Sequence, residues 1–88
     1  MPQEKIDLLN IPKAFRDPLQ KLVRSLRAAS TREEIEREGA MELSFILGLE
    51  STKRLRPADI EALYIIFDDA VQERLAALAS ESEGAAKA

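Results

Sequence analysis

The sequence predicts an all-α fold, in which three principal helices form a small bundle. Leu, Ala, Glu and Arg, which favour helices, dominate the composition, and residues typical of strands are few. Apolar residues recur at spacings of three and four, which is the period of a helix. Gly and Pro, which interrupt helices, number only three and four. The helices are expected over about residues 18–29, 31–47 and 57–80.

The first principal helix is predicted to begin at Asp17-Pro18. Aspartate is a good cap, and proline at the first helical position lacks an N–H that would have no partner there. An apolar stripe follows at helical spacing: Leu19, Leu22, Val23, Leu26 and Ala29. Phe15 keeps the same phase, so a kinked helix that begins at Pro12 is an alternative. Residues 1–11 are expected to form either a short N-terminal helix or an extended arm.

The second helix is predicted to begin with a capping box and to end at a glycine. The box fits two registers, Ser30 with Glu33 or Thr31 with Glu34. Gly48 is placed to take a left-handed conformation after the last turn. One face of the helix is expected to carry Ile35, Gly39, Leu43, Ile46 and Leu47. A different face carries Met41, Phe45 and Leu49.

The last helix has the clearest pattern. Pro57 suits its first position, and Asp59 and Glu61 favour its positive end. The apolar residues that follow alternate spacings of four and three, as in a coiled-coil seam: Ile60, Tyr64, Phe67, Val71 and, after an interruption, Leu78. Residues 81–88 lack any periodic pattern and are expected to be a disordered tail. Residues 1–80 are then a single helical domain.

The composition argues against an enzyme, a cofactor and a metal site. The chain has no histidine and no cysteine, which excludes the commonest general base, the usual nucleophile pairs and thiolate ligation. Glu34, Glu38 and Glu42 follow one another at four-residue spacing, and we interpret them as a solvated acidic face. The acids Glu4 and Asp7 argue against a signal peptide, and no segment is apolar enough for a membrane. The chain is therefore expected in the cytoplasm.

The patterning predicts a non-catalytic protein-interaction module that works as an adaptor, regulator or inhibitor. A last helix of 24 residues would be about 36 Å long, more than the shorter helices can cover, so we expect a homodimer. The residues expected to carry self-association are Ile60, Tyr64, Phe67 and Val71. A secondary apolar contact is expected at Met41, Phe45 and Ile65, because these residues lie off the main apolar stripes.

Basic residues are clustered although the net charge is −3. We expect five of them to dock an acidic protein partner: Lys21, Arg24, Arg27, Arg54 and Arg56. The alternative is a nucleic-acid-binding regulator that uses the basic clusters at 13–32 and 53–56. That alternative requires both clusters on one face, and no aromatic residues are interleaved with them for base stacking.

Overall fold

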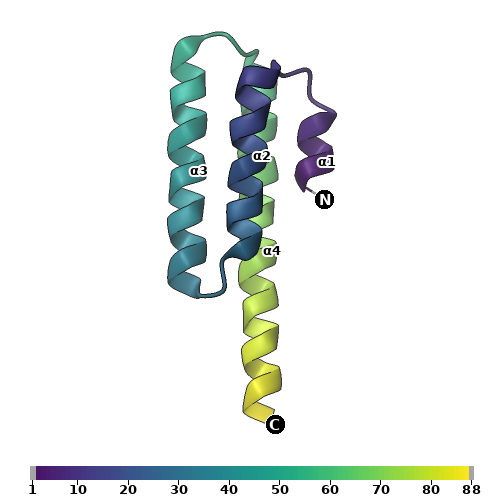
Figure 1. Cartoon of the computed structure of the whole chain (residues 1–88), viewed down its shortest axis with the longest axis vertical. Coiled ribbons are helices and arrows are strands. Elements are labelled where there is room, and N and C mark those ends of the chain that lie inside the picture. The colour runs from purple at the N-terminus through teal and green to yellow at the C-terminus, as the bar shows by residue number, and fades with distance from the viewer. Residues whose placement is uncertain (1, 88) are drawn as a thin grey trace.

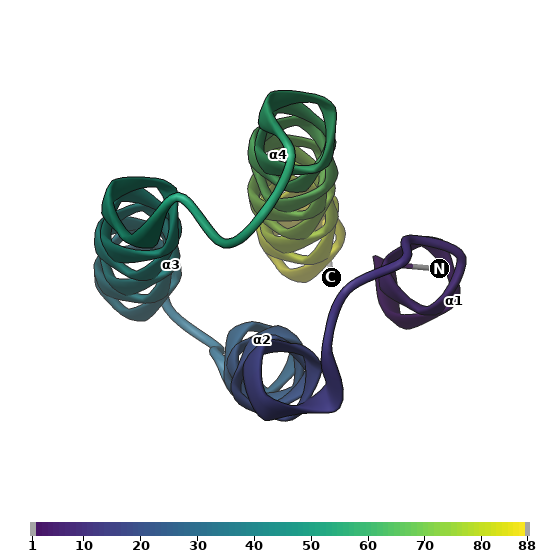
Figure 2. The same cartoon turned by 90° about the horizontal axis from the view of Figure 1, so that it is seen from above.

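The computed structural model describes the backbone of residues 2–87 and the side chains of residues 2–81. It confirms the all-α prediction, with four helices and no strand among these residues. The helices are α1 (Pro2–Asp7), α2 (Lys13–Ala28), α3 (Arg32–Thr52) and α4 (Pro57–Lys87). Helices α2, α3 and α4 form a three-helix bundle, and α1 packs beside α2 and α4 (Figures 1 and 2).

Helix α1 settles the open question at the N-terminus in favour of a short helix. Its Ile6 side chain is fully buried in the main core. Gln20 of α2 donates from Nε2 to the Gln3 carbonyl at 3.1 Å and to Asp7 Oδ1 at 2.9 Å. A six-residue helix is too short to be stable alone, so these contacts with α2 and α4 hold it in place.

Helix α2 begins at Lys13, which matches the alternative start rather than the one at Asp17-Pro18. The Pro12 carbonyl accepts the first helical hydrogen bonds, from the amides of Phe15 and Arg16. Pro18 therefore lies inside the helix, where it cannot donate to the carbonyl four residues earlier. Phe15 packs against the main core, and this burial offsets the missing hydrogen bond.

Helix α3 uses the Thr31 register of the capping box and does not end at Gly48. The Glu34 amide donates to Thr31 Oγ1 at 3.1 Å, and the Glu34 carboxylate accepts from the Ser30 amide at 3.0 Å. The prediction that Gly48 ends the helix is wrong. The helix continues to Thr52, and its cap is Lys53, which has a left-handed φ of 58°. The extra turn carries Leu49 into the core.

Helix α4 begins at Pro57 as predicted and continues to Lys87, beyond the expected end near Ser80. Its C-terminal part extends past the ends of α2 and α3 (Figure 1), and the molecule measures 50 × 21 × 18 Å. The side chains after Glu81 lie outside the described residues, and the predicted disordered tail over residues 81–88 stays a prediction.

The core consists of two apolar clusters, one above the other along the bundle. The larger one lies around residues such as Leu19, Val23, Ile46, Leu63 and Phe67. The smaller one contains Leu26, Ala29, Ile35 and Ala70. On the buried stripe of α3, the residue between Ile35 in one cluster and Ile46 in the other is Glu42.

A candidate docking groove between α3 and α4

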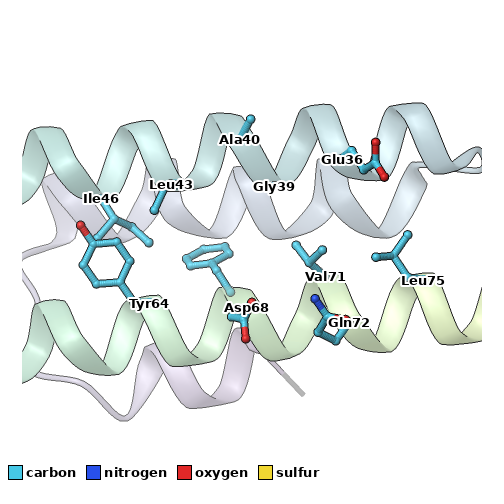
Figure 3. A pocket seen from close by; sticks show the side chains of 11 residues that line it. Glu36, Gly39, Ala40, Leu43, Ile46, Tyr64, Asp68, Val71, Gln72 and Leu75 are labelled. Carbon is cyan, nitrogen blue, oxygen red and sulfur yellow. The ribbon is translucent and has the colours of Figure 1, made fainter.

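An apolar groove of about 480 Å³ lies between α3 and α4. No other helix covers this side of the pair (Figure 2). Figure 3 shows the side chains that line it. The apolar lining consists of Gly39, Ala40, Leu43 and Ile46 of α3 with Tyr64, Phe67, Val71 and Leu75 of α4.

Gly39 sets how closely the two helices approach. A Cβ atom at this position would lie 3.2 Å from Val71 Cγ2, closer than ordinary van der Waals contact. The absence of a side chain therefore lets α4 come close to α3 at this level. Ala40 beside it is also small, and the two residues keep the wall of the groove low.

Large aliphatic side chains stand exposed along the rim of this groove. Leu43 and Leu47 of α3 are 50% and 51% exposed, and they lie one turn apart on the same edge of the helix. Ile65 of α4 is 55% exposed and lies next to Tyr64 in the sequence. Half-exposed leucines beside an apolar trough make a contiguous apolar surface, which marks interaction sites more often than scattered single residues do.

The charged residues that line the groove are acidic. They are Glu36 of α3 and Asp68 of α4, and Glu36 accepts a hydrogen bond from Arg32 Nε at 3.0 Å. The pKa of the Tyr64 phenol is raised above 10.0, first by partial desolvation and second by the nearby carboxylate of Glu50. Tyr64 therefore stays neutral at physiological pH, and it presents a hydroxyl at the edge of an acidic apolar surface.

The four residues predicted to carry self-association divide between the core and this groove. Ile60 and Phe67 are only 4% and 3% exposed, and both belong to the main core. Tyr64 and Val71 are half-buried in the groove. The seam of α4 thus serves mainly to hold the bundle together, and only its outer edge is accessible to another molecule.

The three residues predicted as a secondary apolar contact do not form one surface. Met41 and Phe45 line a shallow hollow on α3, whereas Ile65 is exposed on α4 and lines neither this hollow nor the groove. Phe45 is half-buried against the main core, and Met41 is half-exposed. Sequence reasoning placed Leu43 and Leu47 on the principal face of the helix and so missed their exposure. Leu43 and Leu47 each follow a buried residue, Glu42 and Ile46, by one position. Their shared edge of the helix is therefore turned by about 100° from the buried stripe.

The basic residues predicted to dock an acidic partner lie in two separate places. Lys21 and Arg24 are exposed on α2, and Arg27 donates to Gln3 of α1 at 3.2 Å. Arg54 and Arg56 belong to the connection between α3 and α4, at the end of the bundle where α2 begins (Figure 1). Arg27 is 14 residues along α2 from that end, about 21 Å. Arg27 is therefore far from Arg54 and Arg56, whereas Lys13, which belongs to the 13–32 cluster, lies at the same end of the bundle as the 53–56 cluster.

The predicted solvated acidic face of α3 is wrong for Glu42. This side chain is only 1% exposed, and neither carboxylate oxygen has a hydrogen-bond partner among the described residues. Burial, and secondarily the nearby carboxylate of Glu38, raise the pKa of Glu42 from 4.5 to about 8. The reason is geometric, since Glu42 lies seven residues after Ile35 and four before Ile46 and so shares their buried stripe.

Glu42 is not part of an accessible site. It lines none of the four hollows described for this structure, and its side chain is only 1% exposed. Within the part of the chain that the structure describes, acids, histidines and cysteines form no group able to hold a metal ion. In the same part, no helix contains a stretch both long and apolar enough to cross a membrane.

The comparisons add no relative. No protein-family model, no curated protein and no solved structure matches the chain.

Proposed function

We propose that the chain is a non-catalytic protein-interaction module, an adaptor, regulator or inhibitor, which binds a helix of its partner in the α3/α4 groove. The observation that carries this proposal is the apolar trough flanked by the exposed side chains of Leu43 and Leu47. A helix laid along the groove would bury these leucines and add a fourth main helix to the bundle, which is a common mode of peptide recognition.

The absence of histidine and cysteine supports a role without catalysis. The one carboxyl group with a strongly raised pKa, Glu42, is enclosed in the core. The cytoplasmic location stays a prediction from the sequence.

The homodimer predicted from the sequence becomes a weaker candidate for this groove. Ile60 and Phe67 are buried within one chain, so a second copy would have to pack on Tyr64, Val71 and the rim. A two-fold axis would also bring equivalent acidic side chains of the two copies toward each other. The homodimer is therefore an outcome of the tests below rather than the proposal.

Site-specific photocrosslinking in the native cells tests the proposed function. A benzophenone amino acid at Leu43, inside the groove, is expected to form an adduct with one defined protein. The same group at Met41, equally exposed on another side of α3, should not form it, and Leu75→Glu in the groove should abolish it. An adduct that forms equally from both positions, or that survives Leu75→Glu, would overturn the groove as the binding site.

A further inference from the structure

We infer that the occupant of the α3/α4 groove is a basic amphipathic helix from a different protein, with aliphatic anchors along one face and Lys or Arg on its flanks. This inference rests on the proposed function, because it assigns the chemistry of the partner to the same groove. Three features of the structure lead to it: the acidic charge of the rim, the length of the groove, and the burial of the apolar stripe on α2, the chain's own basic helix.

The rim of the groove carries several acidic side chains and little compensating charge. Asp68 lines the groove, Glu50 lies close enough to Tyr64 to raise its pKa, and Glu61 lies two turns before Asp68 on the same exposed edge. No ion pair within the described residues involves these three carboxylates, whereas Glu36 is paired with Arg32. Lysines or arginines on the flanks of a bound helix would be attracted to Glu50 on the α3 side and to Glu61 and Asp68 on the α4 side.

The dimensions of the groove suit about three turns of helix. Its α3 wall runs from Glu36 to Ile46 and its α4 wall from Tyr64 to Leu75, each about 15 Å long at 1.5 Å per residue. Anchors at positions i, i+4 and i+7 of a partner span about 10 Å and fit this length. The exposed leucines continue one turn beyond the trough to Leu47, which suits an elongated occupant better than a small apolar molecule.

A second copy of the chain does not offer the required helix. Among the helices that the structure describes, α2 alone is basic, and its apolar stripe is buried in the core, with Leu19 and Val23 fully covered and Leu26 nearly so. What α2 exposes is basic but not apolar, including Lys21 and Arg24. Pairing of two grooves would place acidic rims together. The charge therefore favours another protein over self-association.

Two synthetic peptides test the inference with the full chain. Both have 15 residues and leucines at positions i, i+4 and i+7 of one helical face, and their flanks carry lysine in one and glutamate in the other. Binding is followed by fluorescence anisotropy at two salt concentrations. The lysine peptide is expected to bind at least about tenfold more tightly than the glutamate peptide, and to weaken as salt increases.

Matched charge reversals on α4 then locate the attraction. Asp68→Lys is expected to weaken binding of the lysine peptide by about fivefold. Asp69→Lys makes the same change in net charge at a neighbouring exposed residue that does not line the groove, and should change binding less than about twofold. Equal losses in the two variants would show a non-specific attraction and overturn the inference.

Leu43→Ser separates this inference from the proposed function. The substitution should weaken both peptides by about tenfold, through loss of buried apolar area. If both peptides bind equally and both depend on Leu43, the groove binds helices but the basic partner is wrong. If neither peptide binds and light scattering shows a dimer that Leu43→Ser dissociates, the occupant is a second copy and the inference is overturned. If neither peptide binds and the chain is monomeric, both proposals are overturned.

Discussion

Glu42 is predicted to make the bundle less stable as pH rises, and replacing it should reverse this effect. Its pKa is about 8 in the folded chain, against 4.5 for an exposed glutamate. The folded state therefore binds the proton more tightly between these values, so the free energy of unfolding falls as pH increases through this window. Each pKa unit corresponds to about 1.4 kcal/mol. At pH 7 the penalty reaches about 3 kcal/mol, and above pH 8 it levels off near 5 kcal/mol.

These values are large for a domain whose total stability is expected to be about 5–10 kcal/mol. Glu42→Gln keeps the shape of the side chain and removes its charge. We expect it to raise the free energy of unfolding by about 3 kcal/mol at pH 7, with a small effect near pH 4.5. Glu42→Leu should give a similar or larger gain, because it also removes the polar atoms that have no partner in the core.

Urea denaturation followed by circular dichroism, at about pH 5, 7 and 9, measures this prediction. Glu36→Gln, at an exposed glutamate of the same helix, is the control and should change stability by less than about 0.5 kcal/mol at each pH. The difference between wild type and Glu42→Gln must grow from pH 5 to pH 9. A difference that is constant or absent would show that Glu42 is ionised and solvated in the folded chain, and the reasoning about α3 would fail.

The other predictions concern the capping and packing of the helices, and the free energy of unfolding measures each of them. Gly48→Ala should stabilise the chain by about 1 kcal/mol, because the site is in a helix with open space around it. Gly39→Ala should gain much less, since its Cβ would press on Val71, and an equal gain would contradict the close approach. Thr31→Ala should cost about 1 kcal/mol through loss of the N-cap. Ile6→Ala should cost about 2–4 kcal/mol, and a neutral result would show that α1 does not dock.

The sequence was sufficient for the fold because the strongest signals were local. Helical periodicity, the capping box at Thr31 and the proline at position 57 each depend on a few neighbouring residues. The end of α3 was not predictable in the same way. Gly48 offered a local stop, but burying Leu49 required one more turn, and tertiary packing decided the outcome.

The groove was only partly predictable, because it depends on which face of α3 turns inward. The sequence identified an excess of apolar residues on α3 and α4. Of the residues predicted to carry self-association, Tyr64 and Val71 lie half-buried in the groove. The sequence could not tell that Phe67, which also lines the groove, is buried in the core of its own chain. The spacing of α4 residues fits contact with α3 of the same chain as well as contact with another chain, and only the packed bundle distinguishes the two.

The placement of Glu42 and Leu43 connects the core with the proposed docking surface. Adjacent residues on a helix point about 100° apart, and α3 buries Glu42 while it leaves Leu43 half-exposed. Its inward stripe follows Ile35, Ile46 and Leu49, which carries the carboxyl group inward and leaves the leucine half-exposed. Both placements are unfavourable for an isolated chain. Positions that oppose the folding of a small protein are expected where the surface has another role. A partner that covers Leu43 would remove one of the two penalties, and the free energy of binding would include that gain.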